Sequence, residues 1–260
     1  MLFAKRIALV TGAGSGIGKA SALALAREGA TVILMGRTAS ELEATAREIA
    51  ARGGGTARPM IADISDEEAM ATAFAVLADE FGHLDCVFAN AGINGTWAPL
   101  DELRYADWQK TMSVNLGGTF LTLHHAIPLM KARGGVILIT SSINGNRTFT
   151  TAGATAYATT KAGQVALAQM AALELAQYRI RVNVICPGAI ESEIEDNTKR
   201  VDVEAAEVPA EYPEGDVPLT HGAPGEAEDV AELVVFLASD RAKHITGTPI
   251  YVDGAQSLLV

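Results

Sequence analysis

Apolar runs of strand length alternate with helix-length amphipathic stretches along most of this 260-residue chain. Most of the runs are continuously apolar, which favours strands of a parallel sheet that is covered on both faces. The expected strands are Ile7–Thr11, Thr31–Met35, Thr56–Ala62, Leu84–Ala89, Gly135–Thr140, Arg181–Cys186 and Ile250–Val252. The expected helices are Gly16–Glu28, Ser40–Arg52, Asp66–Phe81, a long stretch at Tyr105–Arg133, Ala154–Gln177 and Glu226–Ala238. This order predicts a single α/β domain over residues 1–260, with a doubly wound (Rossmann-type), mostly parallel sheet of about seven strands and helices on both faces.

Residues 191–224 interrupt the alternation. This segment is rich in acidic residues, has no strong apolar period and contains Pro209, Pro213, Pro218 and Pro224. A loop of this length in a compact domain is usually functional or disordered. It follows a strand end, and ligands of doubly wound sheets bind beyond the carboxyl ends of the strands. The segment is therefore expected to form a substrate lid.

Composition and charge argue against several classes of protein. Hydrophobic residues make up 49% of the chain and charged residues 20%, which is typical of a globular domain. No apolar run reaches the roughly 18 residues of a membrane span, and the N-terminal residues lack a signal-peptide arrangement. The net charge of −11 argues against nucleic-acid or anionic-membrane partners. Cys86 and Cys186 lie in apolar runs and are expected to be buried thiols in a cytoplasmic protein.

The glycine run Thr11-Gly12-Ala13-Gly14-Ser15-Gly16-Ile17-Gly18 stands where the first strand turns into the first helix. Glycines there allow backbone N–H groups to approach a pyrophosphate at the positive end of the helix. An ordinary tight turn is the simpler alternative. A phosphate-binding loop of a nucleotide triphosphatase fits less well, because Ala13 replaces its leading glycine and Ala20 its Ser/Thr.

Tyr157 and Lys161 are one helical turn apart, so they share a helix face. A free tyrosine has a pKa of about 10 and is too weak a base at neutral pH. A neighbouring ammonium favours the phenolate and lowers that pKa. The pair therefore predicts an acid–base group, although chance surface pairs of this spacing also occur. The five histidines form no metal-ligand spacing, so no metal is expected.

Gly12, Gly16 and Gly18 form a Gly-x-x-x-Gly-x-Gly motif rather than the ordinary dinucleotide fingerprint. With Asn90-Ala91-Gly92, Asn115, Ser142, Tyr157, Lys161 and Pro187-Gly188, the chain resembles the short-chain dehydrogenase/reductase family over nearly its whole length. The resemblance implies an oxidoreductase that transfers a hydride between a nicotinamide cofactor and a small alcohol or carbonyl substrate. The alternative, which is not an enzyme, is a catalytically silent NAD(P)-sensing protein with the same fold.

The resemblance implies four catalytic residues: Asn115, Ser142, Tyr157 and Lys161. Tyr157 is expected to be the acid–base group, and Lys161 to bind the nicotinamide ribose as well. Ser142 is expected to bind the reacting oxygen, with Ser141 as its competitor. Asn115 is expected to kink its helix and to reach Lys161 through water, unless it is a plain polar residue of the helix surface.

The identity of the cofactor depends on Gly36-Arg37 after the second strand. An acidic residue here favours NAD and an arginine accommodates the 2′-phosphate of NADP, so NADP is favoured over NAD. Arg37 can instead be a solvent-facing residue, and Ser15 stands where many NADP-users of the family carry a base. Asp63 is expected either to meet the adenine amino group or to cap a helix.

Other cofactor contacts are implied at strand ends. Asn90-Ala91-Gly92 and Pro187-Gly188 can also be ordinary turns. The complete implied set is Gly12, Ser15, Gly16, Ile17, Gly18, Arg37, Asp63, Ile64, Asn90, Ala91, Gly92, Tyr157, Lys161, Pro187, Gly188, Ile190 and Ser192.

Two features bear on assembly. The helices at Tyr105–Arg133 and Ala154–Gln177 are apolar over much of their circumference, more than burial of one stripe requires. With the family resemblance, this predicts a homotetramer. Ala255 stands where the family commonly has a glycine, which is expected to affect only subunit packing.

Overall fold

A seven-stranded parallel sheet forms the centre of the computed structural model, which describes residues 1–191, 194, 197–208, 212 and 215–259. The strand order is β3-β2-β1-β4-β6-β7-β9. The bounds are β1 Ile7–Thr11, β2 Thr31–Gly36, β3 Thr56–Ile61, β4 Cys86–Ala89, β6 Gly135–Thr140, β7 Ile180–Pro187 and β9 Pro249–Val252. The order changes direction between β1 and β4, and their carboxyl ends form the crevice at which doubly wound sheets bind ligands. The predicted fold class is confirmed.

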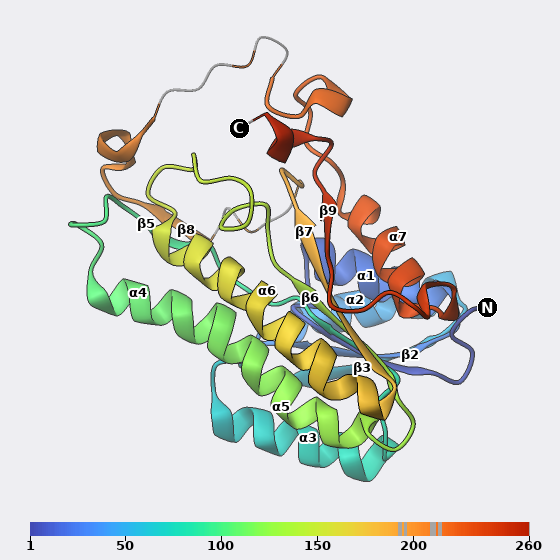
Figure 1. Cartoon of the computed structure of the whole chain (residues 1–260). Helices are drawn as coiled ribbons and strands as arrows, with labels where there is room; N and C mark the ends of the chain where they lie inside the picture. Colours follow the sequence, from blue (N-terminus) through green and yellow to red (C-terminus); the bar gives the residue numbers. More distant parts are fainter. Residues whose placement is uncertain (192–193, 195–196, 209–211, 213–214, 260) are drawn as a thin grey trace.

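Helices cover both faces of the sheet (Figure 1). Their bounds are α1 Gly16–Arg27, α2 Ala39–Arg52, α3 Glu67–Phe81, α4 Tyr105–Met112, α5 Gly118–Met130, α6 Thr155–Leu175 and α7 Ala227–Ala238. Alternate residues of a strand point to opposite faces. Leu9 of β1 therefore packs in the core with α3, α5 and α6, whereas Ala8 and Val10 pack in the core with α1, α2 and α7.

Acidic residues begin two of the helices, as their sequence positions indicate. The Asp66 carboxylate accepts a hydrogen bond of 3.0 Å from the Ala69 N–H at the start of α3. Glu226 and Asp229 form a reciprocal capping box at the start of α7. Each cap satisfies backbone donors that the first helical turn leaves unpaired.

The long helix expected at Tyr105–Arg133 is interrupted. A five-residue π-helical turn, Ser113–Gly117, separates α4 from α5. Such turns insert an extra residue into the helix and often occur at functional sites. Asn115, at which a kink is expected, lies within this turn.

Two short strands were not expected from the sequence. β5 (Gly95–Trp97) and β8 (Thr198–Arg200) form a separate parallel pair, with Gly95 opposite Thr198. β8 belongs to the segment 191–224, which also contains the 3₁₀ turns Val203–Ala206 and Pro218–Thr220. The described part of the proposed lid is therefore tied to the domain rather than irregular throughout.

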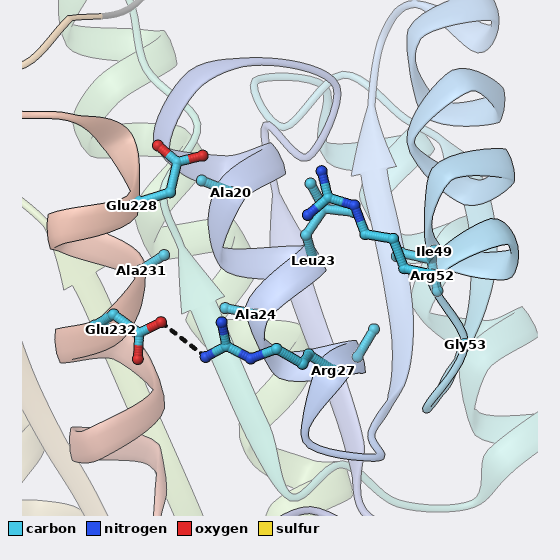
Figure 2. Close-up of a pocket in the computed structure, with 11 residues that line it drawn as sticks. Ala20, Leu23, Ala24, Arg27, Ile49, Arg52, Gly53, Glu228, Ala231 and Glu232 are labelled. Atoms are coloured by element: carbon cyan, nitrogen blue, oxygen red, sulfur yellow. Dashed lines mark hydrogen bonds and ion pairs between the residues drawn. The ribbon is translucent and has the colours of Figure 1, made fainter.

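A groove between α1, α2 and α7 lies on the opposite side of the sheet from α5 and α6. Its apolar floor includes Leu23 and Ile49, and the Arg27 guanidinium donates to Glu232 across it at 2.7 Å (Figure 2). Both side chains are more than half exposed, so this ion pair adds little stability.

Cys86 and Cys186 are buried free thiols, as expected. No helix in the described ranges is long and apolar enough to cross a membrane. Within the same ranges, no group of three His, Cys, Asp or Glu side chains could hold a metal ion.

Candidate active site

The loop between β1 and α1 requires its glycines. Gly12 and Gly16 have positive φ angles of 67° and 46°, which side chains with a Cβ adopt at a cost. A Cβ at Gly18 would collide with the Gly12 carbonyl oxygen. The loop leads directly into α1, whose first N–H groups have no partner within the helix. The positive end of α1 therefore suits an anion such as a pyrophosphate.

A cavity of about 690 Å³ opens at the carboxyl ends of the central strands. Most of the sequence-predicted residues line it, namely Gly12, Ser15, Gly16, Ile17, Arg37, Asp63, Ile64, Asn90, Ala91, Gly92, Ser142, Tyr157, Lys161, Pro187, Gly188 and Ile190. Gly18 and Asn115 are buried behind this lining. Ser192 lies outside the described residues.

Hydrogen bonds among three strand ends fix the cavity floor. The Asn90 N–H donates to Thr11 Oγ1 at 2.9 Å, and its amide donates to the Thr11 carbonyl at 3.2 Å. The Thr140 hydroxyl donates to Asn90 Oδ1 at 2.9 Å. Asn90 thus joins β1, β4 and β6, and its side chain has a structural role beyond that of an ordinary turn residue.

Tyr157 and Lys161 point toward each other from the first turns of α6. Lys161 Nζ lies 5.4 Å from the centroid of the Tyr157 ring and donates to the Thr140 carbonyl at 2.9 Å. Both side chains are at least nine-tenths buried. Burial lowers the pKa of Lys161 to about 8, because desolvation disfavours the charged form, and the nearby Cys186 opposes this shift. The two side chains therefore lie close together in a buried environment, as the acid–base prediction requires.

The two adjacent serines differ in their contacts. The Ser141 hydroxyl donates to the Lys161 carbonyl at 2.7 Å, which ties β6 to α6. Ser142 Oγ instead accepts from the Asn144 N–H at 3.1 Å, and its own proton has no acceptor among the described residues. Both serines line the cavity, but only Ser142 keeps a donor available in these contacts.

Asn115 is fully buried in the π-helical turn. Its Oδ1 accepts from the Ile93 N–H at 2.8 Å, and its Nδ2 donates to the Ile93 carbonyl at 2.9 Å and to Thr160 Oγ1 at 3.1 Å. The side chain therefore ties the backbone after β4 to α6. The alternative of a plain residue on the polar surface of a helix is wrong.

Charged residues gather where the cavity meets the ends of β2 and β3. Arg37 Nη1 lies 4.0 Å from Asp63 Oδ2, and both side chains are partly exposed. Asp63 Oδ1 accepts hydrogen bonds from the Ser65 N–H and hydroxyl at 2.9 and 2.7 Å. Burial acts to raise the pKa of Asp63, but these hydrogen bonds and the charge of Arg37 hold it below its usual range. Asp63 is thus an ionised turn-forming residue that also faces the cavity.

Eight of the described lining residues were missed by the sequence analysis: Thr38, Glu41, Leu42, Ala62, Ile93, Val114, Thr140 and Asn197. Thr140 and Ile93 directly adjoin predicted positions and could have been found from their place at strand ends. Glu41 lies in the first turn of α2 and Asn197 directly before β8, and no motif marks either of them.

Comparisons with known proteins show the family of this chain. The family model described as Enoyl-(Acyl carrier protein) reductase matches residues 12–255. Levodione reductase of Leifsonia aquatica is 35% identical over 98% of this chain and 95% of its own length.

Two solved structures extend the comparison. A 3-ketoacyl-ACP reductase from Sinorhizobium meliloti 1021 is 57% identical, with a TM-score of 0.94 over 98% of this chain and all of the other. A 3-ketoacyl-(acyl-carrier-protein) reductase from Brucella melitensis, complexed with NADH, is 29% identical, with a TM-score of 0.84 over 98% of this chain and 99% of its own. The chain therefore belongs to the short-chain dehydrogenase/reductase family and is an oxidoreductase that acts on alcohol and carbonyl groups.

Proposed function

We propose that the protein interconverts a small-molecule alcohol and its carbonyl compound with a nicotinamide dinucleotide, and that Tyr157 is the proton donor and acceptor. The observation that carries this proposal is the placement of Tyr157, Lys161 and Ser142 in one cavity. When bound, the nicotinamide supplies or accepts the hydride. In the reducing direction the Tyr157 hydroxyl gives its proton to the carbonyl oxygen, and in the oxidising direction the phenolate takes a proton from the alcohol.

The other polar residues support this proton transfer. The free proton of Ser142 is available to the reacting oxygen, which would stabilise negative charge that develops there. The Lys161 ammonium, close to the Tyr157 ring, favours the phenolate. Asn115 acts indirectly as a positioning residue, because it holds the Ile93 backbone and the Thr160 side chain.

The residues present fit a dinucleotide. The glycine loop and the start of α1 would hold the pyrophosphate, and Lys161 the nicotinamide ribose. Asp63 and Ile64 would lie near the adenine, and Pro187, Gly188 and Ile190 behind the nicotinamide. We propose NADP as the preferred cofactor, since Arg37 can meet a 2′-phosphate, with NAD as the alternative.

The proposal also covers the substrate lid, the oligomeric state, the location and the partners of the protein. We propose residues 191–224 as a substrate lid, supported by Ile194 and Asn197 in the cavity lining. A homotetramer in the cytoplasm is proposed from the family and from exposed apolar side chains on α5 and α6, including Phe120, Met170 and Leu173. We propose no nucleic-acid or membrane partner.

Spectrophotometry of NADPH and NADH oxidation over a panel of carbonyl compounds tests the function. The panel should include cyclic ketones and diones and β-ketoacyl thioesters, because the similar proteins are named for both kinds of substrate. We expect turnover of at least one compound. Tight cofactor binding without turnover across the panel would instead favour a cofactor-sensing protein.

A further inference from the structure

Glu41 supplies a carboxylate at the end of the cavity that would hold the adenosine half of a dinucleotide. It lies in the first turn of α2 and lines the cavity together with Gly14, Ser15, Arg37 and Asp63. A Cβ added at Gly14 would stand 2.7 Å from Glu41 Oε2 and 2.8 Å from its Cβ. The Glu41 side chain therefore lies directly over the phosphate-binding loop.

This position matters because the usual ribose-binding acid is missing. Dinucleotide folds commonly place an acidic residue at the end of the second strand, where it accepts hydrogen bonds from the adenosine ribose. Gly36 occupies that place here, and it lines the same cavity as Glu41. A carboxylate that reaches the loop from α2 can accept the same ribose hydroxyls.

The local charge also opposes a second phosphate. Among the described lining residues at this end, Arg37 is the cation, whereas Asp63 and Glu41 are anions. Arg37 already lies 4.0 Å from the Asp63 carboxylate. In addition, a carboxylate in the first turn of α2 partly neutralises the positive helix end that would otherwise attract a phosphate. A 2′-phosphate would thus enter a region in which the carboxylates outnumber the guanidinium.

We infer that Glu41 is a cofactor-discriminating residue, which favours the ribose hydroxyls of NADH and disfavours the 2′-phosphate of NADPH. This inference rests on the proposed use of a nicotinamide dinucleotide. Glu41 limits the preference for NADP that Arg37 alone would produce. The ratio of the affinities for NADPH and NADH therefore depends on the balance between Arg37 and Glu41.

The test is fluorescence titration of the wild type and of E41Q with NADPH and with NADH, at low ionic strength. Glutamine keeps the shape over Gly14 and removes only the charge. The NADPH-to-NADH affinity ratio should rise about tenfold in E41Q, from the loss of one nearby like charge. The rise should shrink in high salt, because the groups are partly exposed.

A matched control is available on the same helix. Glu43 lies 4.0 Å from Arg47 and does not line the cavity, so E43Q removes the same charge at a nearby position. We expect E43Q to change the affinity ratio less than twofold. A ratio that stays within twofold of wild type in E41Q, or one that E43Q shifts equally, would overturn the inference. Failure of the wild type to bind either dinucleotide would instead refute the proposed function.

Discussion

Lys161 places a positive charge in a site from which water is largely excluded. The side chain is 3% exposed, and burial lowers its pKa from 10.5 to about 8. Because the pKa remains above neutrality, the group is mostly an ammonium at pH 7 and can favour the Tyr157 phenolate. Burying that ammonium destabilises the folded state, so the role proposed for Lys161 is opposed by a loss of stability.

This burial predicts a pH-dependent stability. Between pH 8 and 10.5 the unfolded chain keeps the Lys161 proton and the folded protein has lost it, so the free energy of unfolding rises with pH. Methionine does not titrate, so Lys161→Met is the reference. Relative to this variant, the free energy of unfolding of the wild type should rise by up to about 3 kcal/mol across this window. Urea unfolding of the cofactor-free proteins at pH 7.5, 9 and 10 measures the difference. A difference that does not change with pH would contradict the prediction.

Tyr157→Phe removes the transferable proton and keeps the ring. We expect kcat to fall by roughly 10²–10⁴, the usual contribution of general acid–base catalysis, while the Kd for NADPH or NADH changes less than twofold. Steady-state kinetics and cofactor titration measure the two effects. Tyr178 contacts Lys131 outside the cavity, so Tyr178→Phe is the control and should keep wild-type kcat. Retained activity in Tyr157→Phe would assign proton transfer to another group.

Ala255 adopts a left-handed backbone conformation with φ of 71°. This conformation costs an L-residue roughly 1–2 kcal/mol, and replacement by glycine removes that strain. The greater freedom of glycine in the unfolded chain cancels only part of the stability gained. Ala255→Gly should therefore raise the free energy of unfolding by about 0.5–1 kcal/mol. Ala176 is the control, because it is exposed and helical, with φ of −56°. Ala176→Gly should lower the free energy of unfolding by a similar amount. Denaturant titrations compare the two variants, and equal losses would show that the Ala255 backbone is not strained.

At the scale of elements, what could be predicted from the sequence depends on how each element is stabilised. The strands β1, β2 and β6 are buried on both faces, so their composition alone identifies them. β5 and β8 are three residues long and are stabilised by each other and by side-chain contacts, so no apolar period marks them. The motifs located residues such as Tyr157 and Ser142 that line the cavity, whereas Glu41 and Asn197 reach it only through the tertiary placement of α2 and β8.

The β5–β8 pair connects the segment 191–224 to the strand end beneath the cavity. Asn94 is buried, and its amide donates to Thr198 Oγ1 at 2.7 Å, while the Arg200 guanidinium lies 5.2 Å from the centroid of the Trp97 ring. Thr198 directly follows Asn197, which lines the cavity. The pair thus holds one side of the proposed substrate region in place.

Thr198→Val tests this connection with little change of shape. The variant loses the hydrogen bond from Asn94 and the longer one, at 3.5 Å, to the Ile194 carbonyl. Loss of the first alone, at about 1 kcal/mol, should raise KM for the carbonyl substrate by roughly fivefold. Limited proteolysis should cut residues 197–208 faster than in the wild type. The Kd for the cofactor should not change, because the glycine loop lies elsewhere. Thr220→Val, in the same segment but outside the pair, is the control. Unchanged KM and proteolysis in Thr198→Val would separate the pair from substrate binding.

At the scale of the whole molecule, apolar side chains remain exposed on two neighbouring helices. Phe120 of α5 is 51% exposed, and Met170 and Leu173 of α6 are 72% and 82% exposed. The two helices are joined by a 2.8 Å hydrogen bond from Gln164 to Thr119, and both cover the same face of the sheet (Figure 1). Exposed apolar side chains on neighbouring helices are a feature of interfaces between subunits.

Leu173→Lys should therefore dissociate the proposed tetramer. In a two-fold interface each substitution is present on both sides, so one change removes two apolar side chains and places two like charges close together. Light scattering coupled to size exclusion should show a smaller particle for Leu173→Lys and the tetrameric mass for the wild type. Ile61 is 64% exposed on β3, away from α5 and α6, so Ile61→Lys should keep the wild-type mass. A monomeric wild type would refute the tetramer. A tetramer that persists in Leu173→Lys would place the interface on another surface.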